Sequence, residues 1–202
     1  MAILSKYGVP FALSDMPKVM RVAIPLLGTK EVVGRGSNRT ILGWRDELNA
    51  AYGVDSNAAK IVGYSDDDIP WCGLGEAYFQ WKAGKKVVAN PLWARNWGGF
   101  GVPVAERINN RLVFYRDRVP SFSDVLVFGR AGGGGHVGNY VCENETHFAV
   151  LGCNQSNAVT IAPIEKDRCI AVHRADYQIA HHPYVDPVHV SRIPGRTSVN
   201  EA

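Results

Sequence analysis

The stretch Asp66-Asp67-Asp68-Ile69-Pro70-Trp71-Cys72-Gly73-Leu74-Gly75-Glu76-Ala77 decides how this chain is expected to fold. Three acids and a proline form a loop, and apolar residues then recur at helical steps, at Leu74, Ala77, Tyr78 and Trp81. Pro70 suits a position just before a helix or in its first turn. The stretch therefore predicts a buried helix whose first turn contains Cys72.

A cysteine in the first turn of a helix has two interpretations. The unpaired N–H groups and the helix dipole favour a thiolate there, which would make Cys72 a nucleophile. Alternatively, Cys72 is a small buried hydrophobic residue, as many unpaired cysteines are. The position alone leaves both open, so the nucleophile hypothesis needs a base elsewhere in the chain.

Composition and charge narrow the class of protein. With 202 residues, 46% hydrophobic and 20% charged, the chain is expected to form one globular domain with a sizeable core. A net charge of +3 is too small to indicate nucleic-acid binding, but it would not oppose binding to an anionic polymer such as a bacterial wall. No apolar run approaches the roughly 20 residues of a membrane helix, and the first residues lack signal-peptide features. We expect a monomer made in the cytoplasm, without membrane insertion.

The cysteines and histidines show no metal-binding pattern that supports a cofactor. The four cysteines, Cys72, Cys142, Cys153 and Cys169, have no CxxC spacing, so neither a disulfide framework nor structural zinc is expected. Zinc at Cys72, His136 and a second cysteine remains an alternative. The other histidines considered, His173, His181, His182 and His189, are interpreted as surface residues.

Helical patterns dominate the first half of the chain. An irregular arm at 1–15 precedes a helix at 16–27 that Pro25 should kink or end, and a second helix at 39–51 should be capped by Ser37 or Asn38. Gly84 should end the helix that begins near Cys72. Trp93 and Trp97 follow, and they are interpreted either as core residues or as a wall of a substrate groove.

Strand patterns dominate the second half, at 125–128, 136–142, 147–155, 158–161 and 168–174. Helices followed by strands predict an α+β fold in which N-terminal helices pack on one side of a small antiparallel sheet. The tail at 177–202 is rich in Pro, His and Ser, and it is expected to be irregular or disordered.

The hairpin between the second and third predicted strands supplies a candidate base. If its loop is three residues long, at 144–146, His136 lies opposite Asn154, with Cβ atoms about 4.5–5.5 Å apart. Asn154 could then accept from one ring nitrogen and leave the other for a thiol. A register shifted by one residue would break this arrangement. On the same face, Gly138 and Gly152 are expected to leave room for a helix.

Four segments together resemble a known family: Pro70-Trp71-Cys72, Asp124-Val125-Leu126-Val127-Phe128, Gly135-His136-Val137-Gly138 and Leu151-Gly152-Cys153-Asn154-Gln155-Ser156. They are similar to the CHAP-like branch of the NlpC-type cysteine peptidases and amidases, and the resemblance spans about 20–174. Members of this family are peptidoglycan hydrolases with a papain-like core, common in phage endolysins and virion lysins. The resemblance implies a catalytic domain at 16–176.

By that resemblance, Cys72 is the nucleophile, His136 the base and Asn154 the polar third member. Trp71, Asp68 and Trp97 are the expected substrate-binding residues, and no cofactor is implied. The partner would be bacterial peptidoglycan, reached through holin-type release or as part of a virion. Two departures are Ser123, where the family usually has glycine, and the lack of evident calcium-loop acids, although 66–68 is acidic. These acids could also bind the free amine of a stem peptide, or simply form a solvated turn.

Two other functions fit the same residues. An acyltransferase or transamidase could use the same Cys-His pair, since fold alone does not decide between transfer and hydrolysis. A non-catalytic virion or wall-binding protein could also keep the fold. Among hydrolases, a stem endopeptidase, a cross-link endopeptidase and an N-acetylmuramoyl-alanine amidase all remain open.

Overall fold

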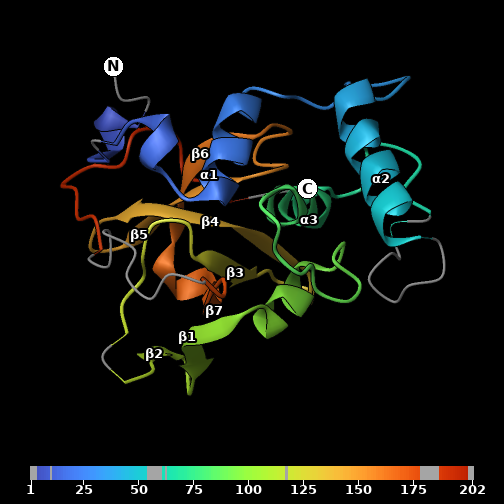
Figure 1. Ribbon diagram of the computed structural model, residues 1–202. Helices are drawn as coiled ribbons and strands as arrows, with labels where there is room; N and C mark the ends of the chain where they lie inside the picture. Colours follow the sequence, from blue (N-terminus) through green and yellow to red (C-terminus); the bar gives the residue numbers. More distant parts are fainter. Residues whose placement is uncertain are drawn as a thin grey trace.

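Seven antiparallel strands form a single sheet, with helices along one face (Figure 1). The computed structural model describes residues 4–9, 11–53, 61, 63–116, 118–177 and 187–199. Helices α1 (Lys18–Ala23) and α3 (Cys72–Lys82) lie next to the sheet, and α2 (Arg39–Tyr52) packs against α3. The predicted α+β class is therefore confirmed.

The helices begin and end where the sequence predicts. α1 gives way to the 3-10 turn η3 (Ile24–Leu26) at Pro25. Asn38 caps α2, because its side-chain oxygen accepts from the Thr40 N–H at 2.8 Å. α3 is followed by Gly84 in the left-handed conformation, with φ of 77°. The remaining 3-10 turns are η1 (Ser5–Tyr7), η2 (Leu13–Asp15), η4 (Ala94–Gly99) and η5 (Lys166–Arg168).

The sheet has the strand order β2-β1-β7-β3-β4-β5-β6. Its strands are β1 (Val102–Ile108), β2 (Arg111–Phe114), β3 (Val125–Gly129), β4 (Gly135–Glu143), β5 (His147–Gly152), β6 (Thr160–Glu165) and β7 (Cys169–Arg174). The five predicted strands correspond to β3–β7, whereas the β1–β2 hairpin at one edge was not predicted. Its turn has positive φ at Asn109 and Asn110, which is typical of a type I′ turn.

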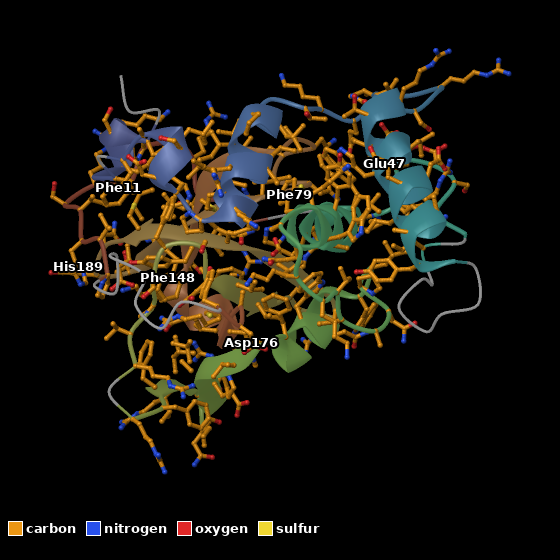
Figure 2. The ribbon with its side chains drawn as sticks, viewed as in Figure 1. Phe11, Glu47, Phe79, Phe148, Asp176 and His189 are labelled. Carbon is orange, nitrogen blue, oxygen red and sulfur yellow. The ribbon has the colours of Figure 1, made fainter. Side chains whose placement is uncertain are left out.

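Two apolar clusters occupy the two faces of the sheet. The main cluster lies between sheet and helices and contains Phe79 of α3, whereas the second contains Phe148 on the other face; both are labelled in Figure 2. Because side chains alternate along a strand, Val137 and Val141 of β4 belong to the main cluster and Tyr140 to the second. Odd-numbered residues in this part of β4 therefore point toward α3.

The two ends of the chain are tied to this core. Leu4, Tyr7 and Val9 of the N-terminal arm are buried in the main cluster. In the tail, residues 187–199 form no named helix or strand, but the Val190 N–H donates to the Glu143 carbonyl at 2.9 Å. Among the described helices, none combines the length and apolar character needed to cross a membrane.

Candidate active site

Cys72 is the first residue of α3 and is 4% exposed. The first intrahelical bond runs from the Gly75 N–H to the Trp71 carbonyl, at 3.0 Å. The N–H groups of residues 72–74 therefore precede the internal ladder of the helix and point out of its N-terminal end. Donors in this position can stabilise an oxyanion that forms next to the thiol.

Trp71 supports the start of this helix from inside the protein. Its indole is fully buried, its Nε1–H donates to Glu31 Oε2 at 3.1 Å, and its ring centroid lies 6.1 Å from that of Trp44. A fully buried indole with these contacts supports the residue that follows it, and substrate binding by Trp71 stays a prediction.

Two glycines let α3 approach its neighbours closely. A Cβ at Gly73 would lie 2.2 Å from the Pro91 carbonyl oxygen, and one at Gly75 would lie 2.1 Å from Cys153 Sγ. Neither position has room for a side chain. The first turn of α3 thus packs between two segments. Residues 91–95 are called here the 91–95 segment, and residues 153–155 are called the 153–155 turn.

A buried carboxyl links α3 to β4. Glu76 Oε2 accepts from Asn139 Nδ2 at 2.6 Å, and its Oε1 accepts from Gln80 Nε2 at 2.8 Å. Burial raises the pKa of Glu76 to about 7, although the two hydrogen bonds act in the opposite direction. Glu76 lies one turn beyond Cys72, so this bond fixes the first turn of α3 relative to the middle of β4.

His136, the second residue of β4, is completely buried, and its ring centroid lies 6.3 Å from that of Phe128. Its Nε2 lies 3.2 Å from Gln155 Oε1. Gln155 Nε2 donates to the Thr160 carbonyl at 2.8 Å and to the Val150 carbonyl at 3.2 Å. Because those bonds orient the amide, Oε1 must accept from the ring, which leaves Nδ1 as the nitrogen able to take a proton.

Gln155, not Asn154, therefore holds the ring of His136. The predicted register is confirmed next to the site, since Gly138 pairs with Gly152 and Asn139 with Leu151. However, β5 ends at Gly152, and Asn154 adopts φ of 59°, which turns the chain. Asn154 Oδ1 is buried and accepts no hydrogen bond from the described residues. The sequence signal for Gln155 is its place in the motif Leu151-Gly152-Cys153-Asn154-Gln155-Ser156, directly after Asn154.

The small residues of the hairpin also have a different purpose from the one expected. A Cβ at Gly152 would lie 3.0 Å from both His136 Nε2 and Gln155 Oε1. Gly152 thus makes room for the imidazole and its partner. The room for the approach of α3 comes from Gly75.

Residues next to Cys72 and His136 contact the same two segments. The 91–95 segment contacts Gly73, which follows Cys72, and Gly135, which precedes His136; a Cβ at Gly135 would lie 3.2 Å from Arg95 Cγ. In the 153–155 turn, Cys153 packs under α3 and Gln155 bonds the imidazole. The thiol-bearing and imidazole-bearing residues are therefore at the same end of the α3–β4 pair.

The other cysteines are in environments that suppress a thiolate. All four cysteines are buried, and none of them forms a disulfide within the described residues. Burial raises the pKa of Cys142 and of Cys169 to about 12. The pKa of Cys153 is also raised, mainly by burial and further by Glu76 and Cys72 nearby. Of these thiols, Cys72 alone is at a helix N-terminus.

The three acids before the helix differ from one another. Asp67 is buried, and its Oδ2 accepts from the backbone N–H groups of Val32 and Asn38 at 2.9 and 2.8 Å. Asp68 is exposed, and its own N–H donates to Asp66 Oδ1 at 3.0 Å. The three carboxylates have oxygens within 4.8 Å of one another. Asp67 is structural, and substrate binding by Asp68 stays a prediction.

Trp97 is a core residue. It is fully buried, and its Nε1–H donates to the Pro91 carbonyl at 3.0 Å. Its burial agrees with the core interpretation, and substrate binding by Trp97 stays a prediction. Trp93 is 56% exposed and is the tryptophan of the 91–95 segment that faces solvent.

No protein-family model matches this chain, and comparisons with curated proteins and with solved structures found no match either. The chemistry of the site is therefore argued from its own residues.

Proposed function

We propose that this chain is a cysteine-dependent peptidoglycan hydrolase with a papain-like core, which cleaves an amide in the peptide stem or cross-link. One observation carries the proposal: residues next to Cys72, the first residue of α3, and His136, near the start of β4, contact the same two segments. The buried Gln155 amide that bonds the imidazole supports it. A thiol, a base and an orienting group are the parts that such a reaction needs.

The reaction follows from these roles. His136 Nδ1 takes the proton of Cys72, and the thiolate attacks the amide carbonyl carbon, whose oxygen becomes an anion held by N–H groups of the first turn. The C–N bond then breaks, and the imidazolium gives its proton to the leaving amine. Water attacks the thioester while His136 accepts its proton, and the carboxylic acid leaves as the thiol is restored. Gln155 keeps the imidazole of His136 in one orientation during both acylation and hydrolysis of the thioester.

The substrate assignment comes from the family resemblance and from charge. The net charge of +3 suits an anionic wall polymer. Asp68, exposed a few residues before Cys72, could hold a free amine of a stem peptide.

The test is turbidity loss of purified peptidoglycan, with soluble products identified by mass spectrometry. Wild-type protein should clear the suspension, and Cys72→Ala should reduce the rate by at least about a thousandfold. Cys169→Ala is the matched control, since that thiol lies in the second cluster on the other face of the sheet. Clearing by Cys72→Ala, or no clearing of several wall types by wild type, would overturn the proposal.

The same experiment separates hydrolysis from transfer. A transferase would join an added amine acceptor to the wall peptide and release little free carboxylic acid. A hydrolase would release the free acid whether or not the acceptor is present.

A further inference from the structure

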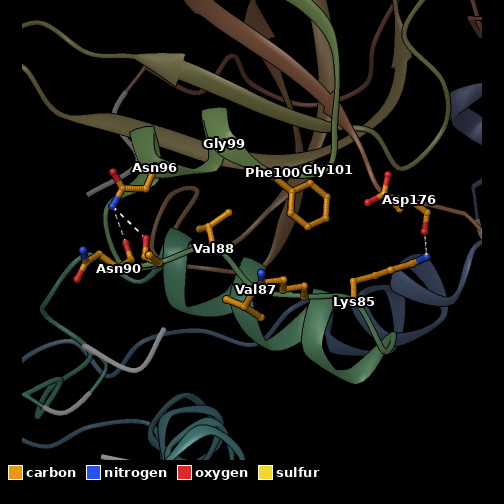
Figure 3. Close-up of a pocket in the computed structure, with 11 residues that line it drawn as sticks. Lys85, Val87, Val88, Asn90, Asn96, Gly99, Phe100, Gly101 and Asp176 are labelled. Atoms are coloured by element: carbon orange, nitrogen blue, oxygen red, sulfur yellow. Dashed lines mark hydrogen bonds between the residues drawn. The ribbon is translucent and has the colours of Figure 1, made fainter. Parts of the chain in front are cut away.

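A cavity of about 650 Å³ lies between the chain that leaves α3 and the end of η4 (Figure 3). One wall is formed by residues 85–90 and the other by Asn96 and residues 99–101, with Asp176 at one end. Neither Cys72 nor His136 contributes to its lining. It is therefore a separate space from the candidate active site.

One end of the cavity carries excess positive charge. Lys85 Nζ donates to the backbone carbonyl of Asp176 and lies 4.6 Å from the centroid of the Tyr177 ring. Burial lowers the pKa of Lys85, and the charge of Asp176 acts in the opposite direction. The positive charge of Lys18 on α1 lowers the pKa of Lys85 further, so Lys18 lies near Lys85. Lys86, the next residue, is exposed and also lines the cavity. Among the described residues, Lys18, Lys85 and Lys86 thus bring positive charge to this part of the cavity, and an anion would be attracted there.

The other end presents amide groups. Asn96 Nδ2 donates to the carbonyls of Ala89 and Asn90, at 3.2 and 3.0 Å, so its Oδ1 points away from them (Figure 3). Asn90 has φ of 48°, in the left-handed region, and its side chain also lines the cavity. Between the two ends lie Val87, Val88 and Phe100 (Figure 3). From one end to the other, the cavity thus presents lysines, apolar side chains and asparagine amides. A peptide with a terminal carboxylate and polar backbone amides matches this order.

The cavity runs alongside α3 toward Cys72. Pro91, directly after Asn90, contacts Gly73 in the first turn, whereas Lys85 follows the last turn. The 11 residues of α3 span about 16 Å. An extended peptide covers about 3.4 Å per residue, so about four or five residues would join an amide at Cys72 to an anion at the lysines.

We propose that this cavity binds the carboxylate-terminated arm of the peptide substrate, with its carboxylate at Lys85 and Lys86 and its amides at Asn90 and Asn96. The identity of the peptide rests on the proposed function. The binding itself requires no chemistry at Cys72, so the two can be tested apart.

The first measurement is binding to the full chain carrying Cys72→Ala, by calorimetry. The probes are a soluble wall stem peptide with a free C-terminal carboxylate and the same peptide as its C-terminal amide. The free acid should bind about tenfold more tightly, and added salt should reduce the difference. Adding Lys86→Ala, an exposed position, should remove most of the difference, whereas Lys6→Ala, also exposed, should not. Equal affinity for acid and amide, or no effect of Lys86→Ala, would overturn the inference.

Hydrolysis of the free-acid peptide by the chain with an intact Cys72 gives the second readout. Lys86→Ala should raise KM about tenfold with kcat retained, since it removes binding that is the same in the ground and transition states. If the wall is not cleaved but the acid still binds through Lys86, the proposed function fails and this site stands. If cleavage occurs with KM unaffected by Lys86→Ala, this inference fails and the proposed function stands.

Discussion

Glu76 of α3 and Asn139 of β4 are joined by a hydrogen bond of 2.6 Å across an otherwise apolar interface. Both side chains are buried, and Gln80 donates a second bond to the same carboxyl. Because a buried polar group without a partner is costly, this pairing selects one position of the helix along the strand. Cys72, one turn earlier on α3, is positioned by the same bond.

The Glu76 carboxyl should make stability depend on pH. Its pKa is about 7 in the folded protein, above its ordinary value of 4.5, so the folded state binds the extra proton between these values. The stabilisation is complete below pH 4.5 and is lost as the pH rises to about 7. Denaturant unfolding should show a decrease of about 3 kcal/mol at most over this range. Glu76→Gln should flatten the profile, and an equally steep profile in that variant would contradict the assignment.

Gly75 should tolerate no side chain. A Cβ there would lie 2.1 Å from Cys153 Sγ, so Gly75→Ala forces α3 and the 153–155 turn apart and should reduce the free energy of unfolding by about 1–3 kcal/mol. Cys153→Gly in the same chain should recover part of the loss. Gly43 in α2 is the matched control, because nothing lies within 4 Å of a Cβ there. Gly43→Ala should be neutral or stabilise by up to about 1 kcal/mol. Chemical denaturation of the three variants decides the matter.

Gln155, rather than Asn154, should be needed for catalysis. Gln155→Ala removes the acceptor at His136 Nε2, so the ring loses its fixed orientation, and kcat should decrease about tenfold to a thousandfold. Asn154→Ala should change kcat less than about threefold, because no residue of the described chain donates a hydrogen bond to its oxygen. Steady-state kinetics on a soluble wall peptide measure both. A larger loss with Asn154→Ala would reverse the two roles.

Replacing the acids before α3 by alanine should change the free energy of unfolding by different amounts. Asp67→Ala removes the acceptor for two backbone N–H groups and should destabilise the protein by about 2–3 kcal/mol. Asp68→Ala, at an exposed position, should stay within about 0.5 kcal/mol. Thermal unfolding gives both values, and similar shifts for the two variants would show that Asp67 is not the structural acid.

Periodic patterns predicted α2, α3 and the strands β3–β7, because burial of one face imposes a regular spacing on the sequence. The β1–β2 hairpin was missed because it is at the sheet edge, where much of β2 is exposed and alternation is weak. The acids at 66–68 look equivalent in the sequence. Their difference depends on Val32 and Asn38, which are far away along the chain.

The sequence predicted the parts of the candidate site that lie in regular helices and strands. Hairpin pairing placed His136 correctly relative to Gly152, but it could not be extended through the left-handed residue Asn154. That single φ value decides which side chain reaches the imidazole. Likewise, Trp93 and Trp97 are equivalent by composition. Their exposure differs because of how the 91–95 segment folds against α3.

The tight fit of Cys153 against Gly75 gives the native chain a built-in probe of local opening. An alkylating reagent can reach that sulfur only when α3 lifts from the sheet, so its labelling rate measures the free energy of this motion. Cys169, in the second cluster, would respond to opening of the other face. Thiol labelling of the unmodified protein can therefore compare the stability of the two layers without any introduced label.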